Sequence, residues 1–339
     1  MLMNYSASEI KLSNPLPTSY GIVTGAKNGF VKISYGDFCG YGEAVPISRY
    51  GEDIKNVLSC FEKFSNYLGN DPWAIEEVAQ IFNKFELKSA AAKSAVNMAL
   101  YDLVGKLLGI PLYKLLGLSN LDTPYTSYTI GVDTPETVVK KVLSAQNYPI
   151  IKLKIGRKND IDAIKAIRNI SDVTIRVDAN GGWTPEQAIE MINTLANYNI
   201  QFVEQPVASH DLTGLKLVRE NVSIPIIADE SCLSIQDIPR LSECVDGVNI
   251  KLAKCGGISE AIKMIHMAKA FGLKVMIGCF LESSLATTAA AHLTPLADYA
   301  DLDPILFINH DPYQGVRIEN GKIILPETHG LGVELRSDV

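Results

Sequence analysis

Several features that would place this chain of 339 residues in other classes of protein are missing from its sequence. No apolar run approaches the roughly 20 residues that a membrane-spanning helix needs. The N-terminus, Met1-Leu2-Met3-Asn4-Tyr5-Ser6, also lacks the charged region and apolar stretch of a signal peptide. We therefore expect a cytoplasmic protein that does not interact with a membrane.

The sequence also has fewer basic than acidic residues, and its cysteines and histidines show no metal-binding spacing. The chain has 31 Lys and Arg against 38 Asp and Glu, a net charge of −7 and no basic run. A nucleic-acid partner is not expected, because phosphate binding needs a basic face. The six cysteines form no C-x-x-C pair, and a chain of this size needs no disulfides to fold. The five histidines match no metal-ligand spacing.

Five short apolar runs, each carrying charge near its end, organise the middle of the chain. Runs that are brief, apolar and β-branched predict strands buried on both faces, and the stretches between them are long enough for one helix each. The runs are Ile151-Lys152-Leu153-Lys154, Ile175-Arg176-Val177-Asp178-Ala179-Asn180, Phe202-Val203-Glu204-Gln205-Pro206, Ile226-Ile227-Ala228-Asp229-Glu230 and Val248-Asn249-Ile250-Lys251-Leu252-Ala253-Lys254. This alternation predicts a (β/α) barrel.

Three of these predicted strands each carry a carboxylate at the C-terminal end, the edge where such barrels hold their catalytic groups. Asp178 and Glu204 are 26 residues apart, and Glu204 and Asp229 are 25 apart. Three like charges at one rim raise one another's pKa values and repel unless a cation lies among them. Because hard carboxylate oxygens suit Mg²⁺, we predict a magnesium site formed by these three residues. Asn180 is expected to orient a ligand or a bound water, and Glu230 to pair with a lysine.

Lysines precede and follow these carboxylates along the chain. If Lys154 ends the second of eight strands, Lys254 ends the sixth, and strands four apart face each other across the ring. Two amines on opposite sides of a metal-bound substrate are suited to removing a proton α to a carboxylate and returning one to the other face. Near a dication these amines should have a lowered pKa. Lys152 shares a strand face with Lys154 and is expected to assist it, whereas Lys251 is expected to point away and be structural.

In their order and spacing, these motifs resemble the enolase superfamily, in its muconate-lactonizing subgroup. The resemblance is carried by Lys152-Leu153-Lys154, Asp178-Ala179-Asn180, Glu204-Gln205-Pro206, Asp229-Glu230-Ser231 and Lys254-Cys255-Gly256-Gly257, and it extends to Gly40-Tyr41-Gly42-Glu43-Ala44 and Gly330-Leu331-Gly332-Val333. It implies an α/β fold, a TIM-like (β/α) barrel of the modified enolase type with an α+β capping domain. It also implies that Lys154 and Lys254 are the two acid/base groups.

The pattern outside the barrel fits such a capping domain. Ser8 to Val45 alternates apolar and polar residues, which predicts an antiparallel meander, and from Asp53 to about Leu116 the period becomes helical. We expect the capping domain over residues 1–122, completed by about 315–339 from the C-terminus, and the catalytic barrel over 123–314.

The resemblance also implies which residues meet the free amino group of a substrate. Asp301 and Asp303 share a strand face at the barrel mouth. From the residues alone, a structural role as an N-cap or a solvated turn is as open as a binding role. In the dipeptide epimerases of this subgroup, an Asp-x-Asp at this place holds the α-ammonium. Ser127 is expected to line the same pocket. Glu282 is predicted at the end of the seventh strand, where such barrels often bind phosphate. Its negative charge argues against a phosphate site, and we expect it to face the substrate.

A loop near the N-terminus bears on the rest of the substrate. Composition alone favours a plain hairpin connection for residues 17–26, but the resemblance implies that this loop closes over the mouth and brings Tyr20 to the substrate. In members that epimerize Ala-Glu an arginine in this loop pairs with the glutamate, and here Gly21 stands at that place. A neutral or apolar second residue, or broad tolerance, is therefore expected.

Together these features predict a Mg²⁺-dependent epimerase of dipeptides of the L-Ala-L/D-Xaa type. The substrate carboxylate would bind the metal, one lysine would remove the α-proton, and the opposite lysine would reprotonate the enediolate. Muconate cycloisomerase, o-succinylbenzoate synthase or N-acylamino acid racemase activity would use the same site, and a barrel that only binds a carboxylate is the non-enzymatic alternative. The Asp pair favours a dipeptide over an N-acylated substrate. We also expect a homo-oligomer.

Overall fold

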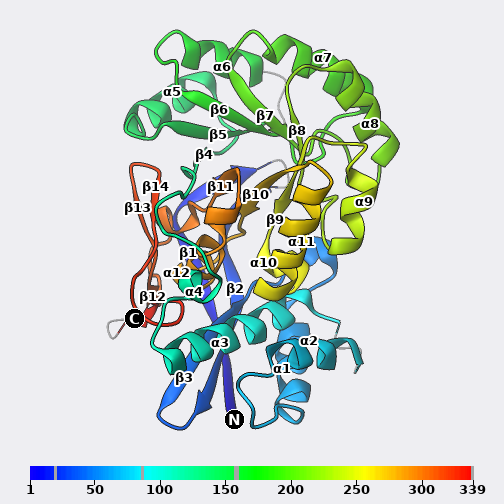
Figure 1. The fold of residues 1–339 in the computed structure, drawn as a ribbon. Coiled ribbons are helices and arrows are strands. Elements are labelled where there is room, and N and C mark those ends of the chain that lie inside the picture. Colours follow the sequence, from blue (N-terminus) through cyan, green and yellow to red (C-terminus); the bar gives the residue numbers. More distant parts are fainter. Residues whose placement is uncertain (19–20, 85–87, 156–159, 337–339) are drawn as a thin grey trace.

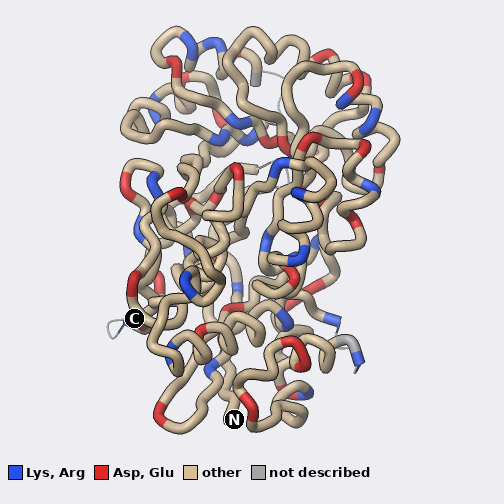
Figure 2. The backbone as a smooth tube through the Cα atoms, in the orientation of Figure 1, with Lys and Arg blue, Asp and Glu red and all other residues tan. Residues whose placement is uncertain are grey.

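The computed structural model describes residues 1–18, 21–84, 88–155 and 160–336. In Figure 1 the barrel strands and their helices occupy one end of the molecule, and the long N-terminal strands with helices α1 to α3 occupy the other. The predicted fold class, a TIM-like (β/α) barrel with an α+β cap, is confirmed. Figure 2 shows basic and acidic residues interspersed along the chain rather than segregated. In the part of the chain that is described, no helix has the length and apolar character needed to cross a membrane.

The cap begins with a three-stranded antiparallel sheet. Its strands are β1 (Leu2–Thr18), β2 (Gly21–Tyr35) and β3 (Phe38–Ala44). The helices that follow are η1 (Ser48–Tyr50), α1 (Ile54–Ser65), α2 (Ile75–Lys84), α3 (Ala90–Leu108) and α4 (Leu112–Leu115). Strand β3 packs closely on α3, because a Cβ atom at Gly40 or Gly42 would lie only 1.9 Å from a backbone carbonyl oxygen of that helix. The glycines of the predicted Gly-Tyr-Gly-Glu-Ala motif therefore serve packing.

Eight parallel strands form the barrel in chain order. They are β4 (Tyr128–Ile130), β5 (Ile150–Lys154), β6 (Thr174–Asp178), β7 (Ile200–Glu204), β8 (Ile226–Ala228), β9 (Gly247–Ile250), β10 (Lys274–Gly278) and β11 (Tyr299–Asp301). A parallel bridge between Thr126 and Ala300 joins the first strand to the last and closes the ring. Strands β5 and β9 are thus the second and sixth of eight, as predicted.

Helices and helical turns follow the barrel strands, and the longer helices cover the outside of the barrel (Figure 1). They are α5 (Pro135–Ser144), α6 (Asp160–Arg168), α7 (Pro185–Leu195), α8 (Leu212–Asn221), η2 (Ile235–Asp237), α9 (Ile238–Leu241), α10 (Leu252–Cys255), α11 (Ile258–Ala270), α12 (Ser284–Ala291), η3 (Thr294–Leu296) and η4 (Pro304–Leu306). Thr134 and Thr184 cap α5 and α7, each followed by a proline whose missing N–H is tolerated at a helix start.

The C-terminal segment returns to the cap. It contains β12 (Tyr313–Gln314), β13 (Arg317–Glu319), β14 (Lys322–Ile324) and β15 (Glu334–Leu335). The Leu112 N–H donates to the Gly330 carbonyl at 2.7 Å, and the Leu331 N–H donates to Asp102 at 2.8 Å. These contacts agree with a cap completed from the C-terminus, whereas the division near residue 122 stays a prediction.

Backbone hydrogen bonds also fix the end of β1 across the barrel mouth. The Ser13 N–H donates to the Phe307 carbonyl at 2.7 Å, and the Val132 N–H donates to the Pro17 carbonyl at 3.1 Å. The cap and the barrel therefore share one pocket.

Candidate active site

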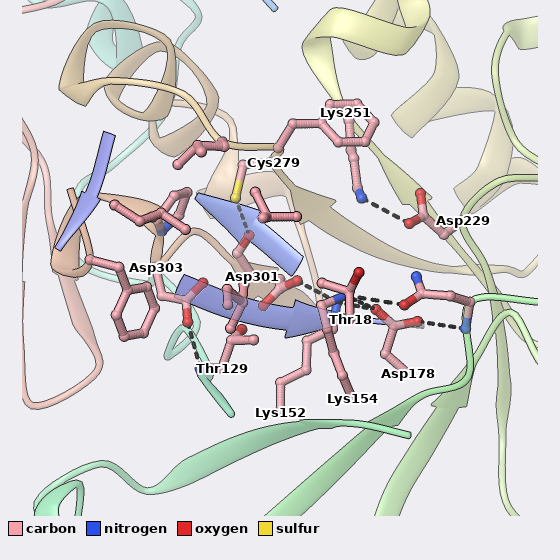
Figure 3. Close-up of a pocket in the computed structure, with 18 of the residues that line it drawn as sticks. Thr18, Thr129, Lys152, Lys154, Asp178, Asp229, Lys251, Cys279, Asp301 and Asp303 are labelled. Atoms are coloured by element: carbon pink, nitrogen blue, oxygen red, sulfur yellow. Dashed lines mark hydrogen bonds and ion pairs between the residues drawn. The ribbon is translucent and has the colours of Figure 1, made fainter. Parts of the chain in front are cut away.

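The pocket lies at the carboxyl ends of the barrel strands and has a volume of about 240 Å³. Its charged part comes mostly from the barrel, with Arg49 from the cap, and comprises Arg49, Lys152, Lys154, Asp178, Asp229, Glu230, Lys251, Asp301 and Asp303. Its apolar part comes from the hairpin and from the loops after β10 and β11, and includes Leu12, Leu16, Val23, Phe280, Leu281 and Phe307. In Figure 3, Lys251 reaches into the pocket from one side, while Lys152 and Lys154 reach in from the other.

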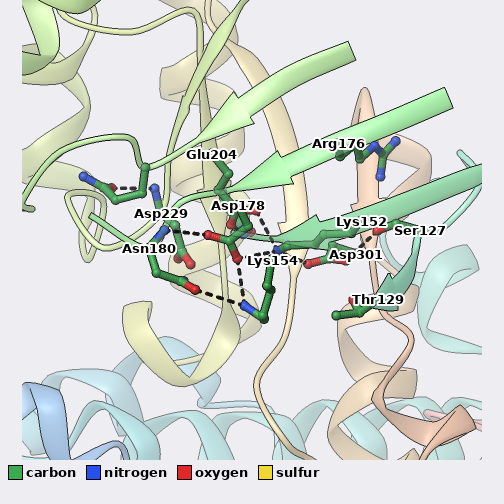
Figure 4. Close-up of polar contacts among 12 residues, drawn as sticks. Ser127, Thr129, Lys152, Lys154, Arg176, Asp178, Asn180, Glu204, Asp229 and Asp301 are labelled. Atoms are coloured by element: carbon green, nitrogen blue, oxygen red, sulfur yellow. Dashed lines mark hydrogen bonds and ion pairs between the residues drawn. The ribbon is translucent and has the colours of Figure 1, made fainter. Parts of the chain in front are cut away.

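The three predicted metal ligands gather in the barrel. Asp178 pairs in register with Glu204 on the neighbouring strand, and Asp229 directly follows β8 (Figure 4). All three are almost completely buried. The Lys152 ammonium lies 3.1 Å from Asp178 Oδ2 and 2.6 Å from Glu204 Oε2. This amine thus shares a site with two of the carboxylates, as the alternation of side chains along β5 predicts.

The carboxylates influence one another's protonation. Burial, opposed by Lys152 and reinforced by the charges of Asp178 and Asp229, raises the pKa of Glu204 to about 8. Although burial acts to raise it, the ammonium groups of Lys251 and Lys254 hold the pKa of Asp229 well below its usual range. The three carboxylates therefore differ in pKa, because burial and the amines that each one faces act on them to different degrees.

The donor chemistry fits a hard dication. Glu204 Oε2 is buried, and its charged partner among the described residues is the Lys152 ammonium at 2.6 Å. Within that same part of the chain, no three acidic side chains already converge as metal ligands; Asp178 and Glu204 turn toward Lys152, and Asp229 toward Lys251. A cation added among them would offset the repulsion between the carboxylates, and carboxylate oxygens are ligands that suit Mg²⁺.

Lys154 and Asn180 lie together on one wall. The Lys154 ammonium donates to Asp178 Oδ2 at 2.9 Å and to Asn180 Oδ1 at 3.3 Å. The Asn180 backbone, in the left-handed region at φ 46°, donates to Asp178 Oδ1 at 3.0 Å. Asn180 therefore orients both the amine and the carboxylate, a position consistent with its predicted supporting role.

On the opposite wall the structure brings Lys251, rather than Lys254, to the pocket. Strand β9 ends at Ile250, so Lys251 takes the place at the rim, and Lys254 lies on the one-turn helix α10. The Lys254 ammonium is buried beneath the rim, where it donates to the Asp229 carbonyl and Asp229 Oδ1, both at 2.6 Å, and to the Asn249 carbonyl at 2.9 Å. The expectation that Lys251 points away is wrong, because it treats all of Val248–Lys254 as a strand.

Lys251 is held by two groups. Its ammonium lies 2.8 Å from Asp229 Oδ2 and 4.4 Å from the centre of the Phe280 ring. Burial acts to lower the pKa of Lys251, but the carboxylate of Asp229 raises it above the usual value. The lowered pKa expected for an amine near a dication stays a prediction.

Asp301 and Asp303 line the far end of the pocket and also close the barrel. Asp301 accepts from Ser127 Oγ at 2.6 Å and from Lys152 at 2.7 Å, and Asp303 accepts from the Thr129 N–H at 2.6 Å. Burial and then the charge of Asp301 raise the pKa of Asp303 to about 7. Ser127 is fully buried behind Asp301 and does not line the pocket.

Two further predictions have different outcomes. Glu282 does not line the pocket; it is buried, and burial followed by the charge of Glu43 raises its pKa well above the usual value. The reason is that β10 ends at Gly278, so the chain has already turned toward the cap at Glu282, and Ser283 caps α12. Tyr20 lies outside the described residues. Thr18, two residues earlier, does line the pocket, so the end of β1 borders the mouth.

Several residues that support the site were not anticipated. Gln205, in the left-handed region at φ 38°, accepts from the Asp229 N–H at 3.0 Å and so ties the end of β7 to the end of β8. Asn249 donates to Glu204 Oε1 at 2.8 Å. Glu230, which was expected to pair with a lysine, forms its ion pair with Arg49 of the cap. The positive φ and the long-range contacts have no local signal in the sequence.

A barrel with carboxylates at its rim, flanked by lysines and covered by an α+β cap, defines an enzyme class, the enolase-type barrels. Residues 4–117 match the family described as mandelate racemase / muconate lactonizing enzyme, N-terminal domain, and residues 136–339 match the enolase C-terminal domain-like family. The chain therefore belongs to the mandelate racemase / muconate lactonizing enzyme family of the enolase superfamily, and the predicted resemblance is confirmed.

Similar proteins within this family are named dipeptide epimerases. An L-Ala-D/L-Glu epimerase of Bacteroides thetaiotaomicron is 39% identical, over 98% of this chain and 88% of its own length. A dipeptide epimerase from Enterococcus faecalis, complexed with Mg and L-Leu-L-Tyr, has a TM-score of 0.94 and 37% identity, and covers 98% of this chain and 99% of its own. One from Cytophaga hutchinsonii, complexed with Mg and D-Ala-L-Val, has a TM-score of 0.93 and 35% identity, and covers 100% of this chain and 97% of its own.

Proposed function

We propose that this protein is a Mg²⁺-dependent dipeptide epimerase that inverts the α-carbon next to the free carboxylate. The observation that carries the proposal is the placement of Lys154 and Lys251 on opposite sides of one pocket, with acidic groups between them (Figure 3). The dipeptide epimerases of E. faecalis and C. hutchinsonii, crystallised with Mg and dipeptides, support the same chemistry for this chain.

Lys154 and Lys251 act as the acid/base pair. The neutral amine of one lysine takes the α-proton and becomes an ammonium, and the ammonium of the other delivers a proton to the opposite face of the planar enediolate. The electron pair of the broken C–H bond forms the new C–H bond, so the configuration inverts with no change in oxidation state. Lys254, which was predicted for this role, instead supports Asp229 from below the rim.

Asp178, Glu204 and Asp229 would hold Mg²⁺ as its protein ligands. When bound, the ion supplies electrostatic stabilisation of the negative charge that develops on the substrate carboxylate. Lys152 adds positive charge on the same side of the pocket, because its ammonium already lies within 3.1 Å of Asp178 Oδ2. Asn180, Gln205 and Asn249 keep the ligand side chains in place through the hydrogen bonds described above.

The ends of the dipeptide are recognised by different parts of the pocket. Asp301 and Asp303 bind the free ammonium, since both line the pocket and are acidic. The apolar part formed by Leu12, Leu16 and Val23 surrounds a neutral or hydrophobic side chain. No basic residue takes the place of Gly21, which agrees with an uncharged second residue.

The function is tested by incubating the protein with Mg²⁺ and a panel of L-Ala-L-Xaa dipeptides in D₂O. We expect α-deuterium incorporation and formation of the L-Ala-D-Xaa epimer with apolar Xaa, detected by NMR. Exchange with N-acetylated dipeptides but with no free dipeptide would favour an N-acylamino acid racemase instead. Absence of exchange with every substrate would contradict an epimerase. Cytoplasmic location and assembly into a homo-oligomer stay predictions.

A further inference from the structure

The two lysines of the pocket are held by different kinds of contact. Among the described residues, the Lys154 ammonium donates to two polar side chains, Asp178 at the end of the neighbouring strand β6 and Asn180 just after it. The Lys251 ammonium has the Asp229 carboxylate on one side and the Phe280 ring 4.4 Å away on the other. A cation this close to the centre of an aromatic ring is attracted by the electron-rich face.

The fold keeps the Phe280 ring at this place. Strands β9 and β10 are paired up to Ile250 and Ile277, so Lys251 and the residues after Gly278 leave the sheet side by side. From the cap, Tyr50 packs its ring edge against Phe280, with the ring centres 6.3 Å apart and an interplanar angle of 62°. The aromatic ring is therefore supported from both domains and has little freedom to turn away from Lys251.

We propose that Phe280 is the positioning residue of Lys251 and thereby controls only one of the two faces of proton transfer. This inference rests on the proposed epimerase function. The side chain of Lys251 is 8% exposed, against 16% for Lys154, so water screens the cation–π contact less than it would at Lys154. Without the ring, the Lys251 amine keeps its carboxylate partner Asp229 but loses the contact that holds the ammonium on its other side.

A simple role as part of the apolar wall would have a different consequence. Phe280 lines the pocket, so its loss could weaken substrate binding in general. Such an effect would slow α-proton exchange from both epimers of the dipeptide in the same proportion. Loss of a contact to Lys251 slows exchange only from the epimer whose α-proton faces that amine.

The experiment measures α-proton exchange in D₂O from each epimer separately, with saturating Mg²⁺. The variants are Phe280→Leu, which keeps an apolar side chain, and Phe280→Tyr, which keeps the aromatic face. The variants Lys251→Ala and Lys154→Ala identify which epimer each lysine serves. As a matched control, Phe307→Leu removes an aromatic ring from the same pocket that packs against Tyr128 instead, with ring centres 5.1 Å apart.

We expect Phe280→Leu to reduce exchange about 10-fold for the epimer that Lys251→Ala disables, while exchange of the other epimer stays within about 2-fold. Phe280→Tyr should restore the wild-type ratio, and Phe307→Leu should change both rates together. Tyr50→Leu, which removes only the support of the ring, should shift the ratio in the same direction by a smaller factor. It also provides a second test if Phe280→Leu does not fold.

Equal losses for both epimers in Phe280→Leu, or an unchanged ratio in both Phe280→Leu and Tyr50→Leu, would overturn the inference. A wild-type protein that exchanges neither epimer would overturn the epimerase function itself, so the two failures are distinguishable.

Discussion

The two walls of the pocket hold their lysines differently. On one wall, Lys154 ends a strand and is held by side chains at the end of the next strand. On the other wall, Lys251 follows the end of its strand and is held by a carboxylate and an aromatic ring. The first arrangement is local to two neighbouring strands. The second depends on β8, on the loop after β10 and, through Tyr50, on the cap. Two groups with the same proposed chemistry are thus supported by different amounts of the fold.

Removing either amine gives the largest expected effect. Lys154→Ala and Lys251→Ala should each lower the rate of epimerization by about 10²–10⁴-fold, because the reaction needs a base on one face and an acid on the other. The rate of interconversion, followed by polarimetry or NMR, checks this. Full turnover in either variant would contradict a two-base reaction.

Loss of a proposed Mg²⁺ ligand, which lies between the two lysines, should affect proton transfer on both faces of the substrate alike. Glu204→Gln should weaken Mg²⁺ binding by more than the roughly 10–100-fold that is typical of losing a supporting group, because it removes a proposed ligand. Calorimetric titration with Mg²⁺ measures this directly, and Asn249→Ala serves as the variant that alters only the support of Glu204. Equal Mg²⁺ affinity in Glu204→Gln and wild type would exclude Glu204 as a ligand.

A variant of Lys254 tests whether this residue has a structural role or an acid/base role. Lys254→Met should lower the free energy of unfolding by about 3 kcal/mol, because it removes a buried ammonium that makes three hydrogen bonds around Asp229. Denaturant unfolding gives this value. The ratio of exchange rates for the two epimers should stay that of the wild type, and a loss confined to one epimer would return Lys254 to the acid/base role.

A change at the end of the pocket that binds the substrate ammonium should lower kcat/KM by about 10–100-fold. Asp303→Asn removes a charged partner of the substrate ammonium, which costs about 1.5–3 kcal/mol. We expect a lower kcat/KM for free dipeptides, dominated by KM, with Mg²⁺ affinity unchanged. An equal loss for an N-acetylated dipeptide would indicate damage to the barrel closure at Thr129 rather than lost recognition.

The smallest effect is expected at the apolar part of the pocket. Leu16→Ala should lower kcat/KM for L-Ala-L-Leu about 10-fold relative to L-Ala-L-Ala, because methylene contacts in a pocket are worth only a few kcal/mol. Competition between the two dipeptides measures the ratio. An unchanged ratio would place the second side chain elsewhere.

The sequence predicts the parts of the site that depend on strands. The barrel, the ring positions of β5 and β9, and the placement of Asp178, Glu204 and Asp229 follow from apolar runs of strand length that end in charge. Lys254 and Glu282 are placed wrongly because each lies beyond the end of its strand, where the direction of a side chain depends on the local turn. Contacts such as Arg49 with Glu230 join distant segments, so periodicity and spacing contain no trace of them.

The central claim is that one lysine on each wall serves one face of the substrate. It is tested most directly by α-proton exchange of each pure epimer in Lys154→Ala and in Lys251→Ala. The account predicts complementary results, in which each variant still exchanges the epimer that the other variant cannot. Exchange of both epimers by Lys251→Ala, or loss of the same epimer in both variants, would contradict it.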